Sequence, residues 1–72
     1  YKKAIETLNQ TLKLKPNYIN AHYALGLFYH QMGEGQKAID QMRYILEKLD
    51  PKNQLAKEAL ETWQQELPSP ER

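Results

Sequence analysis

Cysteine is absent from this chain of 72 residues. No disulfide can therefore cross-link the fold, and neither thiolate catalysis nor a cysteine-ligated zinc site is possible. Long apolar runs are absent too, since none approaches the roughly 20 residues that a helix needs to cross a bilayer. We expect no membrane span, and we expect a small core with little stability to spare.

An excess of charge of one sign is also missing. Ten lysines and arginines stand against nine aspartates and glutamates, and the net charge is +1. Nucleic-acid-binding domains normally carry a strongly basic patch, so we expect no nucleic-acid partner. The hydrophobic share of 40% and the charged share of 26% are typical of a folded globular chain.

Strand patterns are missing as well, because no run alternates apolar and polar residues and no Asn-Gly or Asp-Gly pair marks a hairpin. Apolar residues instead recur at helical spacing in four stretches. We predict helices over residues 1–14, 18–32, 36–49 and 53–67, and therefore an all-α fold. The last stretch carries one apolar stripe, formed by Ala56, Ala59, Leu60, Trp63 and Leu67.

Residues that end or begin helices separate these stretches. Pro16 follows the first, and residues that precede a proline avoid the α region, so the helix should end by residue 15. Gly33 stands where a left-handed cap would close the second helix. Asp50-Pro51 stops the third helix, and Asn53 is a candidate N-cap for the fourth. Residues 68–72 are expected to form a disordered tail.

The chain also repeats itself. A shift of 34 places "KAIETL" (3–8) over "KAIDQM" (37–42), and a shift of 35 places residues 14–16 over 49–51. One extra residue thus precedes Pro51, and we expect it to lengthen the last turn of the third helix. Helices of two types alternate with a period of 34 or 35 residues, which indicates a helix-pair solenoid. The shift of 35 also places Ala21, Ala24 and Leu25 over Ala56, Ala59 and Leu60.

The repeated segment resembles a tetratricopeptide repeat (TPR), whose signature is W-x2-L-G-x2-Y…A-x3-F…P. The matching positions are His22, Leu25, Gly26, Tyr29, Ala38, Met42, Ile45 and Pro51. A glycine inside a helix costs about 1 kcal/mol relative to alanine, so Gly26 should serve a close approach of two helices at Ala38. His22 replaces the usual Trp, and Gly35 replaces an often aromatic residue, which should loosen the turn.

The resemblance divides the chain into parts. Residues 1–17 resemble the second helix of a preceding repeat, 18–52 a complete repeat, and 53–67 a terminal helix. In this last helix Glu61 takes the position of the glycine in the TPR signature. We therefore expect the helix to be a terminal cap that turns this side to solvent. The chain begins at Tyr1 without an initiator methionine, and we expect it to be part of a longer protein.

Two patterns could indicate a bound metal or cofactor. His22 and His30 are eight residues apart, which separates them by about 80° and 12 Å on a helix, too far to share an ion. Gly33, Gly35 and Ala38 fit the dinucleotide pattern G-x-G-x-x-A, but that pattern works only after a strand. We expect neither a metal nor a cofactor.

Catalytic constellations are also not apparent. The candidate acids are Asp40, Glu47, Glu58, Glu61 and Glu66, and they fall on predicted solvent faces. None is expected to pair with a His, Ser or Lys as base and nucleophile. We therefore do not expect an enzyme.

The resemblance implies a protein or peptide partner, because TPR proteins bind such segments on a concave face lined by the first helix of each pair. Carried over to this chain, the partner-binding residues are Asn20, Tyr23, Leu27, His30, Gln31, Leu55, Glu58 and Thr62. The helical period independently places the first five on one face. The clamp that some members use for a chaperone's C-terminal carboxylate needs cationic residues, but Tyr23, Ala24, Leu27, Leu55 and Ala59 stand there. An apolar or mixed ligand is expected.

A second hypothesis concerns the first helix. It lacks a pair-mate, so part of its apolar stripe should be exposed; this stripe consists of Ala4, Ile5, Leu8 and Leu12. Upstream repeats, another chain or self-association would cover such a face. In that case the chain is a structural end-piece that docks into a larger assembly.

Overall fold

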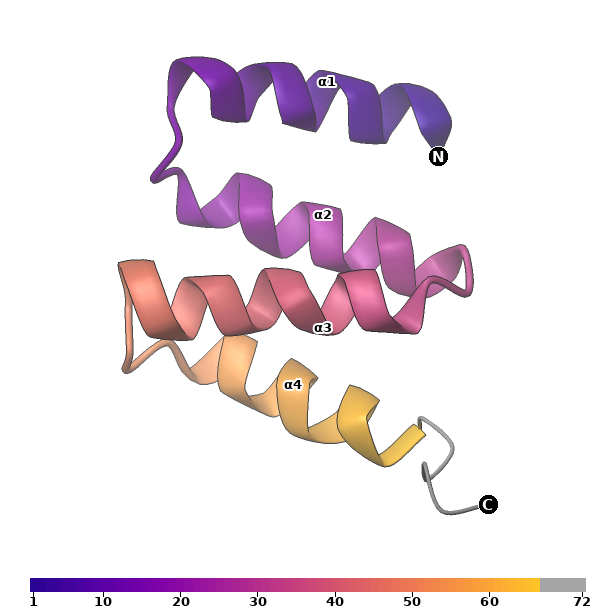
Figure 1. The fold of residues 1–72 in the computed structure, drawn as a ribbon, viewed down its shortest axis with the longest axis vertical. Coiled ribbons are helices and arrows are strands. Elements are labelled where there is room, and N and C mark those ends of the chain that lie inside the picture. The colour runs from indigo at the N-terminus through magenta and orange to yellow at the C-terminus, as the bar shows by residue number, and fades with distance from the viewer. Residues whose placement is uncertain (67–72) are drawn as a thin grey trace.

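The computed structural model describes residues 1–66, which form a row of helices (Figure 1). The elements are α1 (Lys2–Leu14), α2 (Ile19–Gln31), α3 (Gly35–Tyr44), a π-helical turn η1 (Ile45–Leu49) and α4 (Gln54–Glu66). The predicted all-α fold is confirmed. The predicted helical position of Leu67 and the predicted tail 68–72 lie outside the described residues. No helix in the described part is long and apolar enough to traverse a lipid bilayer.

The helices stack in chain order, each running opposite to the one before it (Figure 1). α2 lies between α1 and α3, and α3 with η1 lies between α2 and α4. Short connections and antiparallel neighbours are what a helix-pair solenoid requires. The fold class predicted from the repeat is therefore the one observed.

The core follows from this order, because the central helix α3 is covered on both sides. One buried cluster joins α3 and η1 to α4, and its members are Ala38, Ile39, Met42, Ile45, Ala56 and Trp63. α2 adds Ala21 and Leu25, which are also buried. Each large apolar side chain in such a core contributes roughly 1.5–3 kcal/mol. α1, which has a helix on one side only among residues 1–66, contains no buried residue.

α2 approaches α3 closely at Gly26. A Cβ atom built on this residue would overlap Met42 Cε and would lie 3.4 Å from the carbonyl oxygen of Ala38. The predicted packing reason for a glycine inside α2 is thereby confirmed, and its partners are on α3.

Gly33 closes α2 in the left-handed conformation, with φ of 82°. Its N–H donates to the His30 carbonyl oxygen at 3.1 Å, and the Glu34 N–H donates to that of Tyr29 at 2.9 Å. This pair of bonds defines a Schellman cap. The left-handed cap predicted at Gly33 is confirmed, and Gly35 is the first residue of α3.

The extra residue of the repeat is found in η1. The Asp50 N–H donates to the carbonyl oxygen of Ile45 at 2.7 Å, five residues earlier. A π-helical turn takes up one additional residue inside a helix without ending it. The third helix therefore ends at Leu49, as predicted, but the extra residue widens its last turn.

α4 begins as the sequence predicts. The Asn53 side-chain oxygen accepts a hydrogen bond from the Ala56 N–H at 2.9 Å. This bond satisfies one of the unpaired donors in the first turn, which is the function of an N-cap. Asp50 makes a similar contact just before it, accepting from the Lys52 N–H at 3.2 Å.

Candidate partner-binding face

One face of the molecule combines α2 with α4, and we refer to it as the α2–α4 face. It consists of the eight residues predicted to bind a partner: Asn20, Tyr23, Leu27, His30, Gln31, Leu55, Glu58 and Thr62. On each helix these residues fall within about 100° of rotation, so each set shares one side. The repeat relates the two sets, since a shift of 35 carries Asn20 to Leu55 and Leu27 to Thr62.

His30 joins the two halves of this face. Its Nε2 lies 2.6 Å from Oε1 of Glu66, and its ring stacks on Trp63 with centroids 4.7 Å apart and planes 14° from parallel. Glu66 stands one turn after Thr62 and on the same side of α4. The contact therefore places the partner-binding sides of α2 and α4 next to each other.

One of the candidate acids takes part in this contact. Glu66 pairs with His30, and the ring of His30 is covered on one side by Trp63. These residues are more than thirty positions apart in the chain. Helical periodicity assigns residues to faces but does not say which side chains of two helices meet, so sequence reasoning missed both Trp63 and Glu66 as parts of this site.

A carboxylate that accepts a hydrogen bond from an imidazole also supplies two of the three members of a hydrolytic triad. A triad needs the second ring nitrogen to meet a nucleophile. Within residues 1–66, Nδ1 of His30 makes no hydrogen bond to a hydroxyl group. The pair consequently adds one contact between α2 and the last turn of α4.

Exposure divides the α2–α4 face into two kinds of residue. Leu27 and Leu55 keep 41% and 60% of their surface exposed. Tyr23 differs, because it is half-buried and packs against the core cluster. The two leucines are thus the apolar groups that the face offers to a partner. The exposed polar members are Asn20, Gln31, Glu58 and Thr62.

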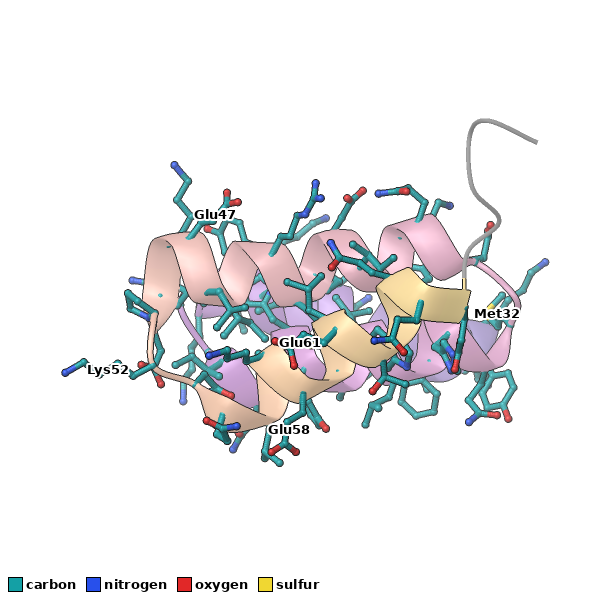
Figure 2. The ribbon with its side chains drawn as sticks, turned by 90° about the horizontal axis from the view of Figure 1, so that it is seen from below. Met32, Glu47, Lys52, Glu58 and Glu61 are labelled. Carbon is teal, nitrogen blue, oxygen red and sulfur yellow. The ribbon has the colours of Figure 1, made fainter. Side chains whose placement is uncertain are left out.

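Figure 2 looks onto α4 and separates three acidic residues by direction. Glu58 projects at the lower edge, Glu47 at the opposite edge near the end of η1, and Glu61 toward the viewer. Only Glu58 belongs to the α2–α4 face. Glu61 is exposed to solvent.

The other histidine, His22, has a structural position. His22 Nε2 lies 2.8 Å from the carbonyl oxygen of Pro16, so this nitrogen carries the proton and donates it. Nδ1 lies 3.0 Å from the side-chain amide of Gln41, and the ring lies 4.7 Å from that of Tyr44. His22 thereby ties the α1–α2 connection to α3. No three candidate metal ligands gather anywhere in residues 1–66.

Antiparallel helix pairs, a shared face and an internal period define a helical-repeat protein. The model of the TPR repeat matches residues 1–33, which span α1, α2 and the Gly33 turn, and identifies this part of the chain as TPR sequence. TPR repeats are generally protein-interaction modules, and TPR domains generally bind other proteins. Comparison with curated proteins and with solved structures gives no significant match.

Proposed function

We propose that this chain is a non-enzymatic protein-interaction module that holds a peptide or helix of a partner protein on the α2–α4 face. The observation that carries the proposal is the pair of exposed leucines, Leu27 and Leu55, on one side of two helices that meet at the contact between His30 and Glu66. Complete burial of a leucine by a partner contributes roughly 1.5–3 kcal/mol. Asn20, Gln31 and Thr62 around them supply the hydrogen-bonding rim that interfaces normally have.

The proposal includes the division of the chain into repeats. Residues 18–52, with α2, α3 and η1, form the complete pair. Residues 1–17 form the second helix of a preceding pair, and α4 takes the place of the first helix of a following one. The close contact between Gly26 and Met42 supports the pairing of α2 with α3.

A selection from a random displayed-peptide library tests the proposal. Peptides selected on the 72-residue chain are measured again with a Leu27→Ala, Leu55→Ala variant, and affinity is expected to fall at least about tenfold. Tyr23 is left unchanged, because it packs on the core and its removal would also lower stability. A Leu14→Ala variant is the control, since Leu14 is 85% exposed on α1. Unchanged affinity in the first variant would exclude the α2–α4 face.

A second candidate function rests on α1. None of its residues is buried, and Leu14 is 85% exposed. The half-buried stripe consists of Ala4, Ile5, Leu8 and Leu12. This supports the alternative that the chain is an end-piece docking through α1. The alternative requires association that Leu8→Lys abolishes, and sedimentation of a stable monomer that melts cooperatively would contradict it.

A further inference from the structure

We infer that the occupant of the α2–α4 face is an apolar segment carrying lysine or arginine side chains, an inference that rests on the proposed function. It concerns the charge of the partner, which the exposed leucines leave open.

α2 contributes no fixed charge to this face. Its sequence, INAHYALGLFYHQ, contains no Asp, Glu, Lys or Arg. The charge of the face is therefore set by α4, where Glu58 lies on the face and Glu66 adjoins it through His30. Lys57 is the one basic residue of α4. It corresponds to His22 in the repeat, which turns toward α3, and it points more than about 100° away from the face.

The two carboxylates keep unused hydrogen-bonding capacity. Glu58 accepts one bond, from the Gln54 amide at 3.1 Å, and Glu66 accepts one from His30. A carboxylate has about four acceptor sites, so both can take further donors. Their side chains remain accessible, since Glu58 is exposed and the side chain of Glu66 is 54% exposed. Ammonium or guanidinium groups supply the strongest donors for such sites, whereas an acidic partner would meet like charge.

A second copy of the chain is the competing occupant. α1 is itself basic, with Lys2, Lys3 and Lys13 against Glu6, and it carries apolar residues. Its stripe, however, already packs on α2 of its own copy, where Ile5 and Leu12 are half-buried. A separate peptide can bring its whole apolar side to Leu27 and Leu55. We therefore assign the face to a separate basic segment.

Two synthetic amphipathic peptides with the same leucine pattern test the inference, one with lysines and the other with glutamates on its polar side. Fluorescence anisotropy at low salt should show the lysine peptide binding about fivefold more tightly, as two exposed ion pairs allow. Raising the salt concentration should shrink this ratio. Glu58→Lys should reduce it to about unity, since the reversal removes one pair and adds a repulsion.

Glu47→Lys is the matched control, because it makes the same change in net charge on the opposite edge (Figure 2). It should leave the ratio within about twofold of the wild type. Equal or tighter binding of the glutamate peptide overturns the inference and leaves the proposed function standing. Binding of neither peptide overturns both. Sedimentation of the same samples tests the competing occupant, a second copy of the chain. Self-association of the wild-type chain that Glu58→Lys abolishes would overturn the inference.

Discussion

α2 and α4 are the same kind of helix placed in two different surroundings. They are 35 residues apart, and the sides that they turn to the core are alike. Ala21 and Ala56 are both buried, and Leu25 and Leu60 occupy equivalent positions. The inward side of α4 therefore has the small and large residues that α2 has, in the same order.

Their other sides differ. α2 turns three residues toward α3: His22, which bonds Gln41; Gly26, which meets Met42; and Tyr29, whose ring lies 5.6 Å below the Lys37 ammonium. The counterparts on α4 are Lys57, Glu61 and Gln64, and all three are exposed. These three polar residues thus distinguish α4, which is packed on a single side, from α2, which is packed on both sides. Exchanging residues between equivalent positions of the two helices tests this interpretation.

The largest effect is expected from Gly26→Glu, which gives α2 the residue that α4 has. Its Cβ would overlap Met42 Cε, and its carboxylate would be buried between two helices. We expect the free energy of unfolding to fall by more than about 4 kcal/mol, which is enough to unfold a domain of this size. Far-UV circular dichroism would show an unfolded chain.

The reciprocal change, Glu61→Gly, is the matched control. Residue 61 is exposed, so only helix propensity is affected and the loss should be about 0.5 kcal/mol. Comparable losses of unfolding free energy for the two variants would contradict the interpretation that residue 26 is packed against α3 whereas residue 61 is exposed.

A smaller but still large effect is expected at the equivalent aromatic positions Trp63 and Phe28. Trp63 is 7% exposed and belongs to the core cluster, so Trp63→Ala should cost about 3–5 kcal/mol. Phe28 is only half-buried, and Phe28→Ala should cost roughly half as much because less area returns to water. Urea denaturation followed by circular dichroism measures both. A greater loss at Phe28 would contradict the assignment of the core to α3 and α4.

The N-caps provide a third contrast. Asn53 caps α4 through its side chain, and Asn53→Ala should cost about 1 kcal/mol. Tyr18 occupies the same position on α2 in an extended conformation, but its side chain makes no capping bond. Tyr18→Asn should therefore stabilise the chain by about 0.5–1 kcal/mol. The midpoints of thermal unfolding should move in opposite directions, and a shift in one direction for both would refute the comparison.

The smallest effect is expected at the link between the two helices. Glu66→Ala removes the bond to His30, which is partly exposed, and should cost less than about 1 kcal/mol. Trp63 continues to stack on His30, so α4 should stay in place. Hydrogen exchange of the last turn of α4 measures the change. Loss of protection throughout α4 would show that Glu66, and not Trp63, holds the helix.

Local features of the fold could be predicted from the sequence, whereas contacts between helices could not. The cap at Gly33 and the cap at Asn53 depend on residues within one turn. The change of repeat shift between residues 42 and 49 predicted where an extra residue lies, although not that it forms a π turn. These predictions succeeded because the physics involved is local.

The candidate site was predictable only in outline. Helical spacing placed Leu27 on one side of its helix, and its exposure agrees with that. Spacing could not show that Tyr23 is half-buried, or that His30 lies on Trp63 beside Glu66. These facts depend on the position of α4 relative to α2, which many residues determine together.

The most direct test of the proposed binding face is an amide ¹H–¹⁵N correlation spectrum recorded during titration with the lysine-faced peptide. Residues of the α2–α4 face should shift together and in proportion to saturation, with Leu27 and Leu55 among the most affected. The amide resonances near Glu47, on the opposite edge, should not shift (Figure 2). Shifts confined to α1 or to the edge around Glu47 would contradict the account.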